Sequence, residues 1–132
     1  MLMSIRFLTD VGSVNIYDYI EQLEITAGDS QSIYFQLVDL AIDRSSAGFN
    51  PPGRRYMPAA TATLAVTLLS VECGKQVLRA AIQPYPQDPS IWMVPILGSD
   101  PLQGTINMNM RLTEPSRILN ISNGKGNIIR IR

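Results

Sequence analysis

One stretch of this chain decides its fold class: residues 105–113, which have the sequence TINMNMRLT. Apolar and polar side chains alternate at every position of this stretch. The apolar side chains that share one face are those of Ile106, Met108, Met110 and Leu112. Strict alternation is typical of a strand with one face buried and the other in water. Residues 105–113 are therefore predicted to form a half-buried antiparallel strand.

The same period of two recurs on both sides of this stretch. Pro95 places part of the strand predicted at residues 91–97 at a sheet edge or a bulge, because proline has no N–H to donate to a neighbouring strand. Residues 14–23 fit a short helix as well as a strand. The further strands are predicted at residues 22–26, 31–39, 60–68, 77–82 and 91–97.

The end of the chain also has strand character. Asn123 and Gly124 form a strong turn signal between residues 116–121 and 127–132, which are predicted to pair as a terminal hairpin. No stretch makes a convincing long helix. We therefore predict an all-β protein, an immunoglobulin-like antiparallel β-sandwich of about seven to nine strands.

The length of 132 residues falls within the usual range of one domain. Residues 1–132 are predicted to form a single β-sandwich domain with two long loop arms, at 44–58 and 84–101. The second arm holds five of the nine prolines. The chain has neither the run of roughly 20 apolar residues that crosses a bilayer nor the pattern of an export signal. We expect a protein that is made and folded in the cytoplasm.

The residue types that carry most enzyme and metal chemistry are scarce. The sequence has no histidine and a single cysteine, Cys73. A thiol near Lys75 could be reactive, but a small half-buried residue at a strand end is the favoured interpretation. The sequence therefore predicts no enzyme, no cofactor, no metal site and no small-molecule substrate. Eleven basic residues balance eleven acidic ones, which argues against a nucleic-acid or membrane partner.

Charge is distributed unevenly along the chain. Residues 1–43 carry a net charge of −6, residues 44–110 a net charge of +2, and residues 111–132 a net charge of +4. An acidic strand can neighbour a basic one inside one molecule. Alternatively, an acidic and a basic patch can join copies head to tail, which closes into a ring when the rotation allows. The sequence leaves both interpretations open.

Residues 25–39 have the sequence ITAGDSQSIYFQLVD. This stretch resembles the opening of small β-sandwich proteins of tailed-bacteriophage virions, of which the N-terminal domain of baseplate upper proteins is an example. The resemblance extends over residues 21–113 and includes the segments 59–66, 91–101 and 105–112. It departs from that pattern in the long loop at 44–58.

The resemblance implies a structural component of a phage virion, in the tail, neck or baseplate, that acts by protein–protein assembly. Its partners would be other virion proteins and copies of itself, and the copies could form a ring. The protein would be synthesised in the host cytoplasm. A capsid decoration protein is the alternative within the same class.

Long loops usually serve function, and arginine pairs well with carboxylates. Candidate interface residues therefore lie on the two arms: Arg54, Arg55 and Tyr56 on the first, and Tyr85 and Trp92 on the second. An alternative from another class is a small carbohydrate-binding β-sandwich. There Trp92, Tyr85 and Tyr56 would form an aromatic platform, although Trp92, which lies between two apolar residues, fits a core or interface role better.

Overall fold

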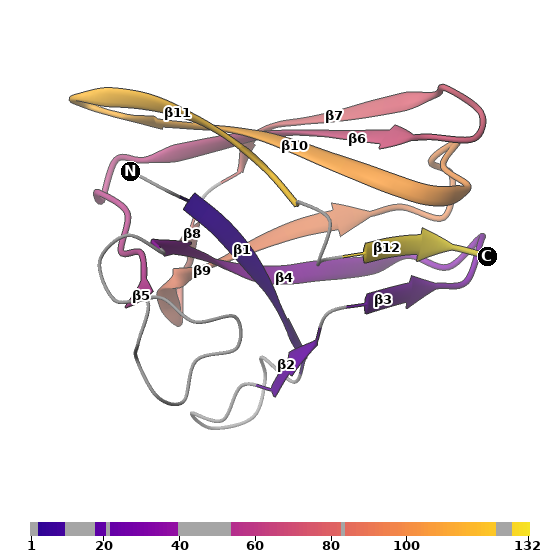
Figure 1. Cartoon of the computed structure of the whole chain (residues 1–132), viewed down its shortest axis with the longest axis horizontal. Coiled ribbons are helices and arrows are strands. Elements are labelled where there is room, and N and C mark those ends of the chain that lie inside the picture. Colours follow the sequence, from indigo (N-terminus) through magenta and orange to yellow (C-terminus); the bar gives the residue numbers. More distant parts are fainter. Residues whose placement is uncertain (1–2, 10–17, 21, 40–53, 83, 124–127) are drawn as a thin grey trace.

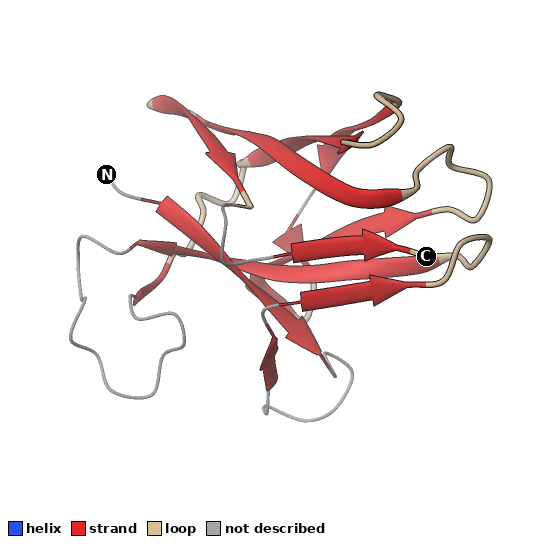
Figure 2. Ribbon diagram, turned by 45° about the vertical axis from the view of Figure 1, so that its right-hand side comes forward, coloured by secondary structure: helices blue, strands red, loops and turns tan. Residues whose placement is uncertain are grey.

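The computed structural model describes residues 3–9, 18–20, 22–39, 54–82, 84–123 and 128–132. All regular elements in these residues are strands, which confirms the predicted all-β class. The strands form two layers (Figures 1 and 2). Within the described residues, no helix is long and apolar enough to span a membrane.

We call the two layers sheet 1 and sheet 2, and each contains six strands in the described part of the chain. Sheet 1 has the order β2-β1-β4-β9-β8, with β5 also paired to β4. Its strands are β1 (Met3–Thr9), β2 (Asp18–Ile20), β4 (Gln31–Asp39), β5 (Arg54–Arg55), β8 (Pro84–Tyr85) and β9 (Asp88–Ile96).

Sheet 2 has the order β3-β12-β10-β6-β7, with β11 also paired to β10. Its strands are β3 (Gln22–Ile25), β6 (Thr63–Ser70), β7 (Gln76–Ile82), β10 (Gly104–Glu114), β11 (Arg117–Ser122) and β12 (Ile128–Ile131). In the described residues, nine of the twelve strands have four residues or more, in line with the predicted seven to nine.

The strand order is that of an immunoglobulin-like sandwich. Strands β1, β4, β9 and β8 follow the order A-B-E-D, and β12, β10, β6 and β7 follow the order G-F-C-C′. One pairing differs from the prediction of a wholly antiparallel fold, because β3 and β12 run parallel.

The core lies between the two sheets and follows the period of two. In β10, Ile106, Met108 and Leu112 are fully buried, whereas Asn107 and Asn109 are exposed. The predicted faces of this strand are therefore confirmed. Burying each large apolar side chain contributes about 1.5–3 kcal/mol, so the alternating strands supply most of the driving force for this packing.

The predicted terminal hairpin is wrong. Strands β11 and β12 each pair with β10 and follow each other along the same edge of it. Asn123 makes this continuation possible, because its backbone N–H donates to the Met108 carbonyl and its Oδ1 accepts from the Met108 N–H, each at 3.1 Å. Residues 124–126 of the predicted turn lie outside the described residues.

The strand predicted at residues 91–97 is confirmed, but it is longer than expected and replaces most of the predicted loop arm at 84–101. Strand β9 occupies its middle and pairs with β4 from Gln31↔Ile96 to Gln36↔Ile91. Pro95 is tolerated there because its carbonyl points to the edge of β9 that faces away from β4. That carbonyl accepts a hydrogen bond from Nε of Arg79 at 3.1 Å. In a strand the N–H and C=O of one residue point the same way, so the missing N–H falls on that edge.

The predicted loop arm at 44–58 is described only from residue 54. Arg54 and Arg55 form β5, and they pair with Asp39 and Val38 of β4. The last part of the predicted arm is therefore a short sheet strand followed by a connector to β6. The rest of the arm lies outside the described residues.

Candidate interaction surface

The two sheets differ in the face that each turns away from the core. On sheet 1, the outward-facing Arg6, Gln36 and Ile91 are at most 1% exposed. The Nε of Arg6 donates to Oε1 of Gln36 at 3.0 Å, and Nε2 of Gln36 donates to Oγ of Ser90 at 3.0 Å. This face is buried and internally hydrogen-bonded, so it offers no open surface at these residues.

The outer face of sheet 2 is open to solvent. Leu78 on β7 is 62% exposed and Ile118 on β11 is 60% exposed. Leu78 lies opposite Thr67 in the register of β6 and β7, and Ile118 lies opposite Thr113 of β10, so both point away from the core. Two large apolar side chains thus flank a face made mostly of polar residues.

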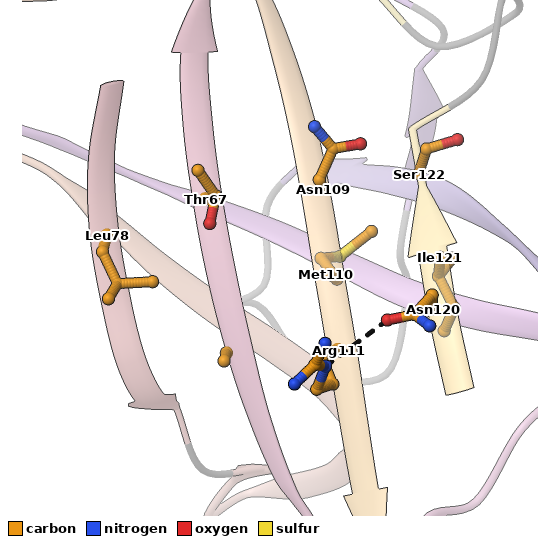
Figure 3. Close-up of a pocket in the computed structure, with 9 residues that line it drawn as sticks. Thr67, Leu78, Asn109, Met110, Arg111, Asn120, Ile121 and Ser122 are labelled. Atoms are coloured by element: carbon orange, nitrogen blue, oxygen red, sulfur yellow. Dashed lines mark hydrogen bonds between the residues drawn. The ribbon is translucent and has the colours of Figure 1, made fainter. Parts of the chain in front are cut away.

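A shallow hollow of about 480 Å³ lies in this face, and we call it the sheet 2 hollow. Ala65 and Thr67 of β6 form a low strip opposite Arg111 and Asn109 of β10. Figure 3 shows Thr67 with the longer Leu78 on one side and Asn109 on the other. The hollow arises because small residues lie between larger ones in neighbouring strands. Its lining residues are Ala65, Thr67, Leu78, Asn109, Met110, Arg111, Asn120, Ile121 and Ser122.

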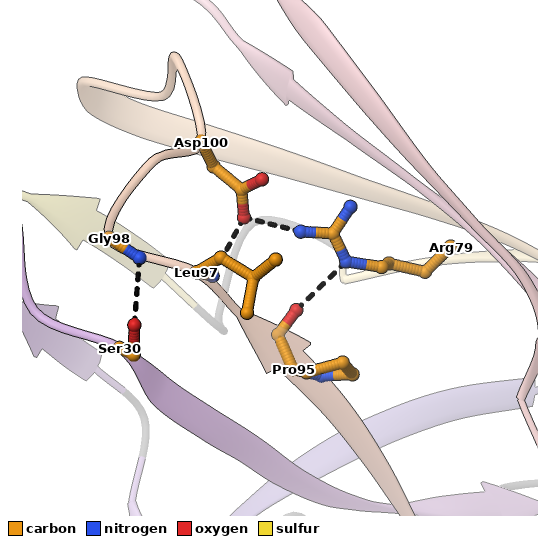
Figure 4. Close-up of polar contacts among 6 residues, drawn as sticks. All are labelled: Ser30, Arg79, Pro95, Leu97, Gly98 and Asp100. Atoms are coloured by element: carbon orange, nitrogen blue, oxygen red, sulfur yellow. Dashed lines mark hydrogen bonds and ion pairs between the residues drawn. The ribbon is translucent and has the colours of Figure 1, made fainter.

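The edges of β7 and β9 on one side of the sandwich are bridged. Arg79 of β7 points to the core side, where its Nε reaches the Pro95 carbonyl and its Nη2 binds Oδ2 of Asp100 (Figure 4). The register of β7 also shifts between its pairs with Leu64 and Val66. An inward-facing charge and a bulge are devices that hinder pairing with a further strand.

Tyr56 belongs to a polar cluster that we call the Tyr56 cluster. Its hydroxyl donates to Oε1 of Glu114 at 2.5 Å, and Arg117 donates to both the hydroxyl and Glu114. The Ala59 N–H donates to Oε2 of Glu114 at 3.1 Å. The Arg117 guanidinium carbon lies 5.3 Å from the centre of the Tyr56 ring. The cluster ties the connector between β5 and β6 to the β10–β11 hairpin.

Electrostatics in the Tyr56 cluster follow from this geometry. Burial alone would raise the pKa of Glu114, but hydrogen bonds from Tyr56, the Ala59 N–H and Arg117 outweigh burial and hold the pKa below its ordinary value. Burial and the hydrogen bond to Glu114 raise the pKa of Tyr56. Tyr56 was predicted to contact a partner, whereas in the structure its hydroxyl binds groups of its own chain.

Trp92 cannot contact a partner, because it is completely buried. It pairs with Phe35 across β4 and β9, and both side chains lie in the core. Its position in phase with Val94 and Ile96 is a sequence signal for the core face. The prediction of Trp92 as an interface residue is therefore wrong, and so is the aromatic platform that would include it.

Tyr85 is half-buried and makes an edge-to-face contact with Tyr34, with 6.0 Å between the ring centres. It also lines a second hollow of about 530 Å³, between residues 58–63 and the segment around β8. For Arg54 and Arg55 the structure describes the backbone, in β5, and not the side chains. Partner contacts by Tyr85, Arg54 and Arg55 stay predictions.

Cys73 lies exposed in the turn between β6 and β7. Its thiol is 3.1 Å from the Ser70 hydroxyl, and hydrogen bonding with Ser70 and with the Lys75 backbone lowers the pKa of the thiol. The half-buried position expected from the sequence is therefore wrong. The described residues contain no group of three potential metal ligands among histidine, cysteine and acidic side chains.

Part of the charge gradient is neutralised inside the molecule. The parallel pairing of β3 and β12 places Glu24 opposite Arg130, and Arg132 lies 3.5 Å from the Glu24 carboxylate. For these residues an acidic strand does neighbour a basic one. Most other acidic side chains of residues 1–43 lie outside what the structure describes.

The chain matches no protein-family model and no curated protein. Among solved structures, it is similar to the filamin domain of Lin-41, with 16% sequence identity and a TM-score of 0.41. That likeness covers 98% of this chain and 91% of the other. The strand order and the open face together define an immunoglobulin-like β-sandwich with one exposed sheet face.

Proposed function

We propose that this chain is a structural component of a bacteriophage virion, in the tail, neck or baseplate, and that it acts by protein–protein assembly. The assembly role is carried by one observation: the outer face of sheet 2 is open, with Leu78 and Ile118 both more than half exposed. An open face on which apolar side chains stand among polar ones has the mixed character of a non-obligate protein interface. The virion setting is supported by the resemblance of residues 25–39.

The distribution of burial supports assembly through this face. The outward-facing residues of sheet 1 are buried at Arg6, Gln36 and Ile91, and the edges of β7 and β9 are bridged by Arg79. Of these surfaces, the outer face of sheet 2 is therefore the most accessible to a partner protein.

A non-catalytic role is part of the proposal. It rests on the absence of histidine from the sequence, because histidine is the commonest general base. It also rests on the Tyr56 cluster, whose polar groups bind one another and hold two segments of the fold together.

Particle incorporation tests the proposal. Phage particles are purified from cells that make the chain, and its copy number per particle is measured by quantitative mass spectrometry. We expect a fixed copy number for the native chain. Its absence from every particle preparation contradicts the virion role.

A pair of double variants tests the surface. Leu78→Lys with Ile118→Lys places two charges on the face and is expected to reduce the copy number strongly. Val71→Lys with Leu97→Lys is the matched control, because these side chains are 52% and 48% exposed but follow the ends of β6 and β9 and do not line the sheet 2 hollow. Equal incorporation of both folded variants excludes the face as the assembly surface.

A further inference from the structure

We infer that the sheet 2 hollow binds an extended acidic segment of a partner protein. A carboxylate of that segment is received by Arg111, and an apolar side chain packs against Leu78. The inference rests on the proposed assembly role and names the partner chemistry that fits this face.

The shape of the hollow suits an extended segment. Thr67 lies between Leu78 and Asn109 in the register of three neighbouring strands, and Ala65 lies opposite Arg111. The low strip formed by Ala65 and Thr67 lets a bound chain approach the sheet closely. Leu78 supplies apolar contact on the side away from Arg111 (Figure 3).

The charge of the hollow selects a carboxylate. Arg111 is the one charged residue that lines it, and the described outward positions of β6, β7, β10 and β11 include no acidic residue. The guanidinium has five N–H donors. In the described part of the chain its side-chain contact is a long hydrogen bond, 3.5 Å from Nε to Oδ1 of Asn120. Its planar fork is thus available for paired hydrogen bonds to a carboxylate.

The neutral polar groups of the hollow favour a protein segment over a glycan. Asn109, Asn120 and Ser122 offer amide and hydroxyl groups to the backbone of a bound chain. The lining includes no aromatic side chain, so the hollow lacks a ring face on which a sugar could stack.

In the described residues, most carboxylates are already bound within this chain. Of the six acidic side chains that the structure describes, five already bind groups of their own chain, and the sixth is Asp29. The five are Glu24, Glu72, Asp88, Asp100 and Glu114. A second copy therefore has few described carboxylates to offer to Arg111.

Peptide titration of the full chain tests this inference. The probe is the acetylated peptide Ser-Val-Glu-Val-Ser-Val-Ser, with matched peptides that carry Gln or Lys in place of Glu. Nuclear magnetic resonance follows the side-chain amides of Asn109 and Asn120 and the Nε of Arg111. We expect saturable shifts with the Glu peptide, and binding at least about tenfold weaker with the Gln peptide, since a charge-assisted pair is lost.

Two variants assign the effect to Arg111. Arg111→Gln is expected to abolish the preference for the Glu peptide. Arg130→Gln is the matched control, because Arg130 lies on the same sheet beside Glu24, and it is expected to keep the preference.

Three outcomes overturn the inference. One is the absence of shifts with every peptide up to roughly 5 mM, and another is equal binding of the Glu and Lys peptides. The third is occupation of the same residues by a glycan, or by a second copy through self-association that Arg111→Gln removes. If peptides fail to bind while the native chain is incorporated into particles, the inference fails and the proposed function stands.

Discussion

The two outer faces of this sandwich each carry an arginine, and the two arginines have opposite environments. Arg6 on sheet 1 is 1% exposed and hydrogen-bonded to Gln36, whereas Arg111 on sheet 2 is exposed and lies beside a hollow. A buried charge must be satisfied within the fold, while an exposed one is free to meet a partner. The comparison teaches that the fold buries the outer face of sheet 1 at these residues and leaves that of sheet 2 open to solvent.

The largest expected difference is between substitutions on the buried face and on the exposed face of sheet 2. Met108→Asp buries a charge in the core and is expected to destabilise the protein by more than about 4 kcal/mol, so that it unfolds or aggregates. Asn107→Asp, one residue away on the open face, is expected to change stability by about 0.5 kcal/mol or less. Urea denaturation measures both, and equal losses contradict the assignment of an open face.

The next effect tests the closed face of sheet 1. Arg6→Ala removes the donor to Gln36 and leaves a cavity among buried residues, so we expect a loss of about 2–4 kcal/mol in the free energy of unfolding. A loss below about 0.5 kcal/mol would show that this face is open as well, and the contrast between the sheets would disappear.

A smaller effect concerns the Tyr56 cluster, which anchors one end of sheet 2. Tyr56→Phe removes the hydrogen bond to Glu114 and is expected to cost about 1 kcal/mol at neutral pH. The pKa of Glu114 is lowered in the folded protein, so its contribution is complete above the unfolded pKa of about 4.3 and is lost as pH falls through the folded pKa.

The pH dependence provides the control for this variant. Because Tyr56→Phe weakens the lowering of the Glu114 pKa, the stability difference between the native protein and the variant should shrink as the pH falls below about 4.3. Thermal unfolding at neutral and acidic pH measures this difference. A gap that is constant with pH contradicts the assigned role of Glu114.

The smallest expected effect is that of Arg111→Ala. Its side chain is exposed and makes one long hydrogen bond to Asn120, so we expect a change in stability within about 0.5 kcal/mol. Set beside Arg6→Ala in the same denaturation series, it isolates the difference between the two faces. A loss as large as that of Arg6→Ala would make Arg111 a structural residue.

The fold could be predicted from local patterns where one face of a strand is buried. The alternation of residues 105–113 gave β10 and its buried side, and Trp92 could have been placed in the core from its phase with Val94 and Ile96. Strand β1 is absent from the sequence prediction, although Arg6 alternates there with the buried Ile5 and Phe7.

Pairing and the site could not be predicted, because both depend on the register between distant strands. Asn123 holds the chain on the edge of β10 through two hydrogen bonds to Met108, and a turn signal alone does not reveal which partner follows. Leu78, Thr67, Arg111 and Asn120 come together through four strands. No local pattern marks them as one surface.

Side-chain footprinting in the assembled particle tests the central claim most directly. Hydroxyl-radical modification of Leu78 and Ile118 is compared between the free protein and purified particles, with Val71 and Leu97 as internal references. We predict that modification of Leu78 and Ile118 falls on assembly while that of the two references is unchanged. If Leu78 and Ile118 react in the particle as they do in the free protein, the open face of sheet 2 is not the surface through which this protein assembles.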